Sequence, residues 1–479
     1  MPRSRLPVDV LASALVGLVI FAWFGHAFLN YDTFYSLLWG SDLAHGRTPS
    51  YKVPVAPTPH PLAMLVGIPA SLFGNGGEAL MLAIVVLAIG FLAVGIFRLG
   101  WELFGWPVGL LAALIVATRQ PFLNYGIRGY VDLVEIALVV WAALLEARRP
   151  RRGWPVLVLL GLAGLLRPEA WLYSAAYWVW LYPSRDWNGR LRLAALAAAA
   201  PLLWGLSDLA ITGDFLWSLH GTHDLASQLH RQTGLLNVPK TMPRRLGEIL
   251  RLPELIAAVA GFVFGLLWMR RKAALPAAVA VLNGLAFCVL AIAGLSLLGR
   301  YLFLAGAVLA LFTALACLGW LELPADHPAR AGWRIFGLVA LAAIVVFFPA
   351  QQVHRLTALR TDIRNRDRVQ SDLRRLAEAD SAKPYLVACR PVFVPNHRPV
   401  PLIAYWADIR PTAIATRDPG PLDVHGSLVL PANAEVQKLS ILDPNEPRPL
   451  ELAAPPDWRL VGRDRSWLLY AGPACGPRG

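Results

Sequence analysis

Long uninterrupted apolar runs constrain the fold of this chain more than any other feature. Residues 8–29 read VDVLASALVGLVIFAWFGHAFL, and residues 78–97 read EALMLAIVVLAIGFLAVGIF. A helix of about 20 such residues crosses the hydrocarbon core of a bilayer and satisfies its own backbone hydrogen bonds there. Only 16% of the 479 residues are charged, whereas a soluble domain carries roughly a quarter. The sequence therefore predicts an all-α polytopic membrane domain.

About eleven segments have this apolar character, which predicts about eleven transmembrane helices. Residues 154–183 are short for two spans, but both of their flanks are basic and must lie on one side of the membrane. We therefore predict a hairpin of two short helices that turns at Arg167-Pro168-Glu169. The predicted spans are 8–29, 78–97, 105–120, 130–146, 154–167, 170–183, 192–211, 253–269, 274–297, 301–321 and 334–350.

Basic connectors alternate with the spans and predict the orientation of the chain. The net charge is +13 and comes mainly from arginine, which accumulates in cytoplasmic loops of membrane proteins. The pattern indicates membrane orientation rather than nucleic-acid binding. With eleven spans, every basic connector falls on the side of the N-terminus: 2–5, 98–102, 146–153, 184–192, 270–272 and 326–334. We expect a multi-pass plasma-membrane protein with a cytoplasmic N-terminus and long outer loops at 30–77 and 212–252.

The composition changes near residue 352, which divides the chain into a membrane domain, 1–351, and a small extracytoplasmic α/β domain, 352–479. The segment after His354 is polar but keeps a helical apolar stripe that includes Leu359, Ile363 and Leu373. Strand-like runs separated by Pro- and Asp-rich turns follow at 384–389, 427–432, 458–462 and 466–472.

The four cysteines fall into two classes. Cys288 and Cys317 lie in predicted spans and are interpreted as packing residues. Cys389 and Cys475 both lie in the outer domain, where the environment is oxidising. A disulfide between them and two free thiols are both open.

Charged and histidine residues gather on the outer side of the predicted topology. Ionisable groups at or inside spans are costly and call for a reason. Each one alone is explained by an interfacial cap or a local ion pair. Together they favour a shared cavity, because they come from five connectors: Asp32, His60, Arg128, Asp132, Glu135, Arg167, Glu169 and Arg300.

The first outer loop holds two further predicted helices. Residues 32–46 have an amphipathic pattern in which Phe34, Leu37, Leu38 and Leu43 lie in the membrane interface while Asp32, Ser36 and Asp42 face water. Residues 62–74 are apolar but short for a span, so a surface-parallel or re-entrant helix is expected.

The same loop resembles the first-loop signature of GT-C fold glycosyltransferases. The signature is carried by Asp32, Tyr35, Leu43, Gly46 and Pro49, followed by Pro-His-Pro-Leu at 59–62. This family comprises polytopic enzymes that use polyprenyl-phosphate-linked sugars, such as protein O-mannosyltransferases, aminoarabinose transferases and arabinofuranosyltransferases. The resemblance covers residues 8–183 well and 192–350 by topology, and the C-terminal domain resembles no family.

The resemblance implies an inverting transfer of sugar to an acceptor hydroxyl on the outer face of the membrane. Asp32 matches the catalytic acid of the family and would act as general base. Arg300, Arg128 and Arg167 would bind the phosphate of the donor. Contacts to the sugar or acceptor would come from Asp132, Tyr35, His60, Glu169 and Tyr301. The alternative is a local ion pair with Arg167 for Glu169 and loop packing for His60.

The resemblance departs from its family at one position that bears on metal binding. Many relatives carry an acidic pair at the start of the signature, but here Thr33 follows Asp32. We therefore expect that no cofactor is required, with Mg²⁺ or Mn²⁺ bound by Asp32 and Asp132 as the alternative. In the outer loop 212–252, His220, His223 and His230 lack the spacing of a zinc site, and this loop is expected to cover the mouth of the cavity.

Three classes of function remain in competition. The first is a membrane glycosyltransferase whose partners are a polyprenyl-phosphate sugar donor, a glycan, lipid or protein acceptor, and membrane lipids. The second is a polytopic lipid or glycan transporter or flippase, for which matching halves with broken helices are expected; the sequence lacks them. The third is a non-catalytic scaffold of the cell envelope, which would tolerate loss of Asp32.

Overall fold

The computed structural model describes residues 6–74, 76–347, 349–417, 420–441 and 450–476. The basic N-terminal segment 2–5, which we predicted to be cytoplasmic, lies outside these residues. Helices of the membrane part are α1(Leu6–Phe24), α2(Tyr31–Ala44), α3(Pro61–Ser71), α4(Gly76–Phe104), α5(Trp106–Thr118), α6(Gln120–Ile127), α7(Asp132–Arg148), α8(Trp154–Gly164), α9(Ala170–Leu181), α10(Trp187–Thr212), α11(Trp217–Gln228), α12(Val238–Leu250), α13(Leu252–Trp268), α14(Arg270–Ile292), α15(Phe303–Leu318) and α16(Arg330–Phe347).

Each of the eleven predicted spans contains a helix. Six helices in the described part of the chain are long and apolar enough to cross a membrane by themselves: α1, α4, α10, α14, α15 (with its short flanking helices) and α16. The bent pairs α5 with α6 (58°) and α12 with α13 (106°) raise the number to eight if each pair is one span. The remaining predicted spans are the shorter helices α7, α8 and α9, of which α8 and α9 form the predicted hairpin. The chain is a multi-pass membrane protein.

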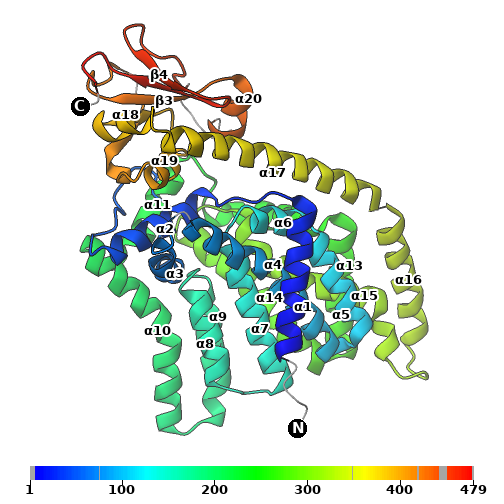
Figure 1. Cartoon of the computed structure of the whole chain (residues 1–479). Coiled ribbons are helices and arrows are strands. Elements are labelled where there is room, and N and C mark those ends of the chain that lie inside the picture. Colours follow the sequence, from blue (N-terminus) through cyan, green and yellow to red (C-terminus); the bar gives the residue numbers. More distant parts are fainter. Residues whose placement is uncertain (1–5, 75, 348, 418–419, 442–449, 477–479) are drawn as a thin grey trace.

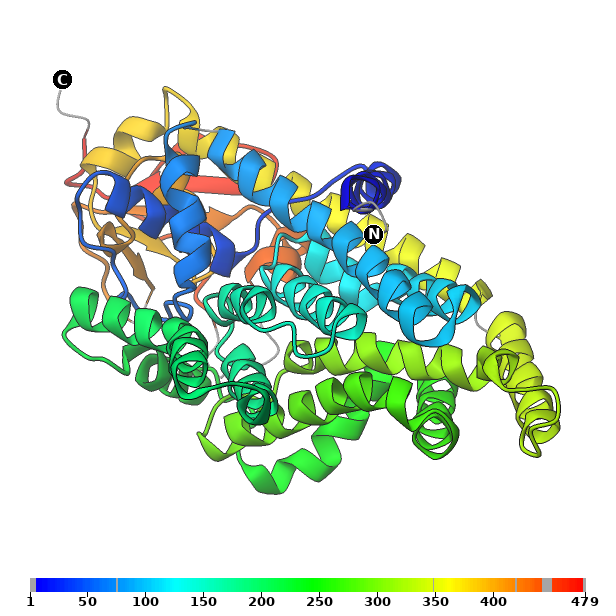
Figure 2. The same cartoon turned by 90° about the horizontal axis from the view of Figure 1, so that it is seen from below.

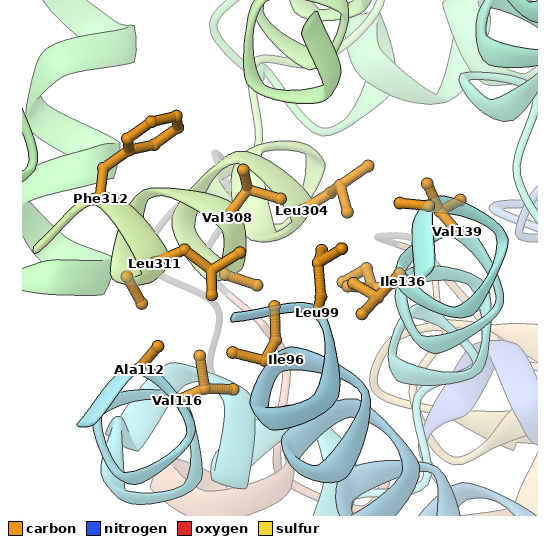
Figure 3. Close-up of a cluster of buried hydrophobic side chains, with 14 of the residues drawn as sticks. Ile96, Leu99, Ala112, Val116, Ile136, Val139, Leu304, Val308, Leu311 and Phe312 are labelled. Carbon is orange, nitrogen blue, oxygen red and sulfur yellow. The ribbon is translucent and has the colours of Figure 1, made fainter. Parts of the chain in front are cut away.

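The core of the membrane part lies where α4, α5, α7 and α15 meet. Figure 3 shows side chains from these helices, among them Ile96, Val116, Ile136 and Leu311, which point toward one another. α15 is buried almost all round, which explains why its sequence is apolar on every face rather than along one stripe. This core supports the helix ends that carry the polar residues predicted to lie on the outer side.

The C-terminal part begins with the long helix α17(Pro349–Glu378), which runs across the end of the membrane part (Figure 1). Its predicted apolar stripe is confirmed, because Leu359, Ile363 and Leu373 are buried. The helices α18(Lys383–Ala388), α19(Val400–Trp406) and α20(Ala434–Val436) follow. The strands are β1(Val392–Val394), β2(Ile414–Thr416), β3(Ser427–Pro431), β4(Arg459–Arg463) and β5(Trp467–Ala471).

The strands form one mixed sheet in the order β2-β1-β3-β5-β4. The pairs β2–β1 and β1–β3 are parallel, and the pairs β3–β5 and β5–β4 are antiparallel. Three of the four predicted strands are present, but the predicted strand at 384–389 is wrong: Lys383–Ala388 is the helix α18, which has Pro384 in its first turn. Cys389 and Cys475 are joined in a disulfide, which ties α18 to the end of the sheet domain.

We predicted that one face of α2 is exposed to water, and this is wrong, because the helix is covered on several sides. Ser36 and Asp42, expected to face water, are buried, and so are Phe34 and Leu37. The ring of Phe34 packs against Trp406 of α19 at 5.5 Å, so the C-terminal part sits on this helix.

The helix α3 crosses α2 at two glycines. A β-carbon on Gly40 would lie 2.5 Å from the carbonyl carbon of Gly67. Only glycine permits so close an approach of two backbones. α2 is therefore held between α3 and α19 as a fixed element rather than a helix that floats in the interface.

The predicted outer loop 212–252 contains two helices, α11 and α12. The segment between them exposes Leu236, which is 96% accessible. Seen from below, α10, α11 and α12 lie at the side of the molecule away from α1 and α16 (Figure 2). One wall of the cavity described next comes from α11 and the residues that follow it.

Candidate active site

The start of α2 is fixed by a hydrogen-bonded cap that positions Asp32. The side-chain oxygen of Asn30 accepts hydrogen bonds from the backbone N–H of Asp32 at 2.7 Å and of Thr33 at 3.2 Å. Asparagine is a favoured residue at this position because it satisfies amides that have no partner inside the helix. Asp32 therefore stands in the first turn of α2 with its side chain directed by the cap.

Thr33 joins this cap to the connector that precedes α7. Its hydroxyl donates a hydrogen bond to the carbonyl oxygen of Gly129 at 2.6 Å, and its side chain is fully buried. Gly129 has φ +64°, a conformation that favours glycine. The residue that replaces the second acid of the family signature thus has a structural contact to the backbone.

Four ionisable side chains from separate parts of the sequence form a linked ion-pair network. Arg300, in the 3₁₀ helix η3(Gly299–Leu302), donates to Asp32 Oδ2 at 3.0 Å, and its Nε lies 4.0 Å from Asp132 Oδ1. Asp132 also forms an ion pair with Arg167. The side chain of Asp32 is 19% exposed and that of Asp132 only 4%. Asp32 is therefore the accessible carboxylate and Asp132 the buried one.

A cavity of about 320 Å³ opens beside this network. Its charged lining is strongly one-sided, since it contains six arginines and a single carboxylate among the described residues: Arg128, Arg167, Arg231, Arg300, Arg366, Arg398 and Asp32. Guanidinium groups present a fork of donors that matches phosphate oxygens. The cavity is thus suited to an anionic, phosphate-bearing ligand with one carboxylate at hand.

The structure brings most of the predicted site residues to this cavity. Its lining includes Asp32, His60, Arg128, Arg167, Arg300 and Tyr301. Arg128 has no carboxylate within ion-pair distance in the part of the chain that the structure describes. Its guanidinium lies 5.5 Å from the ring of Tyr130. Arg128 is thus a cation that a ligand can reach without first breaking an ion pair.

Three predicted contact residues lie elsewhere. Tyr35 is fully buried and packs against Tyr31 and Trp39 beneath the C-terminal part. Asp132 lies behind Arg167 and Arg300 rather than on the cavity wall. Glu169 does not line the cavity, and the local ion pair with Arg167 that we gave as its alternative is not seen among the described residues, because Arg167 pairs with Asp132.

Part of the cavity wall was missed by the sequence analysis. α17 contributes Arg366 and Gln370, and the loop before α19 contributes His397 and Arg398. The segment after α11 adds Arg231. The signal available in the sequence was the arginine-rich run of α17, which reads as a solvated helix face unless its partner is known. The C-terminal part therefore completes the cavity that the membrane part begins.

The geometry also bears on metal binding. In the described residues, no group of three or more His, Cys, Asp and Glu side chains is arranged to hold a metal ion. His220 instead pairs with Asp214 at 2.7 Å. The two carboxylates suggested as alternative ligands, Asp32 and Asp132, are both engaged by arginines.

His60 is a titratable residue of the cavity wall whose protonation depends on its surroundings. It is buried at the start of α3, with Nδ1 left without a hydrogen-bond partner. Burial, with the positive charge of Arg167 next in size, lowers the pKa of His60 from its ordinary 6.5 to about 4. The imidazole is therefore neutral at pH 7.

This shift predicts a loss of stability in acid. Between pH 6.5 and 4 the unfolded chain binds a proton at His60 that the folded protein does not bind, so stability falls as the pH falls. The shift corresponds to about 3 kcal/mol once the pH is below 4. We expect His60→Asn to flatten the decline in melting temperature between pH 7 and pH 4.5 in detergent. Parallel curves for the two proteins would contradict the assignment.

Comparison with solved structures identifies the fold. A crystal structure of ArnT from Cupriavidus metallidurans bound to undecaprenyl phosphate matches with TM-score 0.57 and 13% identity, covering 100% of both chains. The apo state of the same protein matches with TM-score 0.53 and 14% identity, over 99% of this chain and 100% of that one. The archaeal oligosaccharyltransferase AglB from Archaeoglobus fulgidus gives TM-score 0.48 and 13% identity, over 84% of this chain and 63% of that one.

No family model matches the sequence, and no curated protein does. The likeness to ArnT is a likeness of fold. It extends over the full length and includes the small C-terminal sheet domain. The chain thus has the GT-C fold of ArnT, which confirms the resemblance seen in the first loop at the level of the fold.

Proposed function

We propose that this protein is an inverting membrane glycosyltransferase that moves a sugar from a polyprenyl-phosphate donor to an acceptor hydroxyl. One observation carries the proposal: Asp32 faces a cavity rich in arginine and contacts Arg300 at 3.0 Å. The fold supports it, since a structure of ArnT with the same fold is bound to undecaprenyl phosphate. Following the predicted orientation, the N-terminus is cytoplasmic and transfer takes place on the outer face of the membrane.

Asp32 acts as the general base. Its Oδ2 is engaged by Arg300, while Oδ1 has no hydrogen-bond partner among the described residues. Oδ1 accepts the proton of the acceptor hydroxyl as that oxygen forms a bond to the anomeric carbon. The bond between this carbon and the phosphate oxygen breaks, and the configuration at the carbon inverts.

The arginines stabilise the leaving group. Polyprenyl phosphate gains negative charge as the glycosidic bond breaks, and fixed cations lower the free energy of that transition state. Arg300 and Arg128 present their side chains to the cavity. Asp132 is a positioning residue in this scheme, because it holds Arg167 and lies beside Arg300 without lining the cavity. His60 and Tyr301 are the wall residues left to contact the sugar or acceptor.

The reaction is expected to need no divalent metal ion. Arginines already supply the positive charge that a metal would bring to the phosphate. In addition, the hydroxyl of Thr33 is engaged by the Gly129 carbonyl. We expect full activity after EDTA treatment, and a loss restored by Mg²⁺ or Mn²⁺ would show that Asp32 and Asp132 bind a metal.

The test of the function is release of the spent carrier. Purified protein in liposomes is supplied with a pool of polyprenyl-phosphate sugars and a membrane extract as acceptor, and lipids are followed by mass spectrometry. A transferase releases free polyprenyl phosphate and leaves the sugar on the acceptor. A transporter or flippase changes the sidedness of the donor without consuming it, and a scaffold does neither.

A further inference from the structure

The helix α17 has a second polar face, next to the end of α1. Leu359 and Ile363 point into a small apolar cluster with Phe24 and Phe28. Four residues spaced three and four apart, on a different face, are exposed: Thr357, Arg360, Thr361 and Arg364. This face therefore combines two guanidinium groups with two hydroxyls and no apolar side chain.

These four residues line a cavity with the end of α1. The cavity has a volume of about 340 Å³, and its other walls are Phe24, Gly25 and His26. Figure 1 and Figure 2 both show the end of α1 beside α17. We call it the headgroup cavity. It shares no lining residue with the arginine-rich cavity beside Asp32, which we call the catalytic cavity.

No carboxylate among the described residues neutralises the two arginines of the headgroup cavity. Its lining contains no carboxylate. The acids beside it on α17 are already engaged, since Asp362 pairs with Arg366 at 2.8 Å and Asp367 with His26 at 2.8 Å. Arg360 and Arg364 form no ion pair within the described residues. Two arginines and two hydroxyls around an open volume suit a phosphate group.

The position of the cavity shows how the rest of its ligand would lie. α1 is long and apolar enough to span a membrane, and Leu11, Leu15 and Leu18 on its surface are each more than half exposed. Trp23 near its end is partly exposed and lies 5.4 Å from the guanidinium of Arg360. Tryptophan at the end of a span marks the membrane interface. A ligand here would place its anionic head against α17 and its tails along α1.

We propose that the headgroup cavity binds an anionic glycerophospholipid from the leaflet next to the C-terminal part. The phosphate lies between Arg360 and Arg364, the hydroxyl of Thr357 donates a hydrogen bond to it, and the acyl chains run along the leucines of α1. The hydroxyl of Thr361 donates to the carbonyl oxygen of Thr357 at 3.1 Å and lines the polar wall beside the phosphate. The site is independent of sugar transfer. It does fix the position of α17, and Arg366, two residues after Arg364, belongs to the wall of the catalytic cavity.

The test is lipid binding by the full-length protein. Delipidated protein in neutral detergent is titrated with phosphatidylglycerol and with phosphatidylcholine, and bound lipid is counted by native mass spectrometry. We expect phosphatidylglycerol to bind at least about ten-fold more tightly, because its headgroup lacks the choline cation that two arginines repel. The double substitution Arg360→Gln with Arg364→Gln should abolish this preference, and lysine at both positions should retain most of it.

A matched control removes the same charge elsewhere. Arg459 and Arg463 are exposed on β4, and Arg459→Gln with Arg463→Gln should leave the lipid preference unchanged. The proposal fails if the Arg360/Arg364 variant keeps the preference of the wild type. It also fails if millimolar inorganic phosphate displaces the lipid, which would mark a site for a free anion. Binding of undecaprenyl phosphate without phosphatidylglycerol would assign the cavity to the sugar carrier instead.

Discussion

Asp32→Asn is expected to slow sugar transfer by about 100- to 10,000-fold while leaving donor affinity nearly unchanged. The range is that of a lost general base. Asparagine has the same shape and can still accept the hydrogen bond from Arg300, which the structure places at 3.0 Å from Asp32. It cannot take the proton of the acceptor. Two separate measurements check this prediction. The rate of single-turnover transfer should fall, and the affinity for the donor should stay nearly the same.

Asp42 offers a control on the same helix. It is buried and its Oδ1 accepts a hydrogen bond from Arg47 at 3.0 Å, and it does not line the catalytic cavity. Asp42→Asn also removes one carboxylate charge from α2, so any loss common to both variants reflects damage to the helix. A wild-type rate in Asp32→Asn, with Asp42→Asn equally active, would remove Asp32 from the chemistry.

The features that could be predicted from the sequence are those whose physical cause lies in a single segment. Apolar length identified the helices of the membrane part, and the spacing of Leu359 and Ile363 identified the buried stripe of α17. The predicted membrane topology also related residues that are far apart in the sequence. Asp32 and Arg300 are 268 residues apart, yet both were assigned to the outer side because the basic connectors set the orientation.

The predictions were wrong where the local sequence fits two structures equally well and tertiary contacts decide which of them forms. The apolar run at 384–389 is too short to separate a helix from a strand by periodicity, and Pro384 in its first turn fits the helix that forms. Ser36 and Asp42 look like a solvent face until α3 and α19 cover them. Tyr35 stands one helical turn after Asp32, but its ring packs against Tyr31 and Trp39 in the core instead of lining the cavity.

The cavity wall that the C-terminal part supplies could not be predicted from the sequence for a related reason. Arg366, Gln370 and Arg398 are polar residues on a polar domain, and nothing local distinguishes them from solvated ones. Whether these residues line a cavity depends on how α17 lies across the membrane part. The same holds for Asp132: the family resemblance implied a contact to the sugar or acceptor, whereas its burial behind two arginines makes it a residue that positions them.

Arg300→Gln is expected to weaken donor binding and slow the chemical step together. A charge-assisted hydrogen bond contributes about 2 kcal/mol, so donor affinity should fall by about 10- to 100-fold. A further loss of about 100-fold in rate is expected, because a fixed cation stabilises the charge of the leaving phosphate. Arg300→Lys should recover part of the donor affinity and part of the rate, since lysine keeps the positive charge but lacks the forked donors of the guanidinium group.

The matched control is Arg368→Gln, which removes an arginine of α17 that pairs with Glu435 at 2.8 Å outside the cavity. The decisive measurement is the double variant with Asp32→Asn. Residues that act in one step give non-additive losses, and the Asp32–Arg300 contact implies that each substitution costs less when the other is already present. Strictly additive losses would mean that Arg300 binds the donor without taking part in the step that Asp32 catalyses, and the phosphate role would then pass to Arg128, which has no competing carboxylate in the described structure.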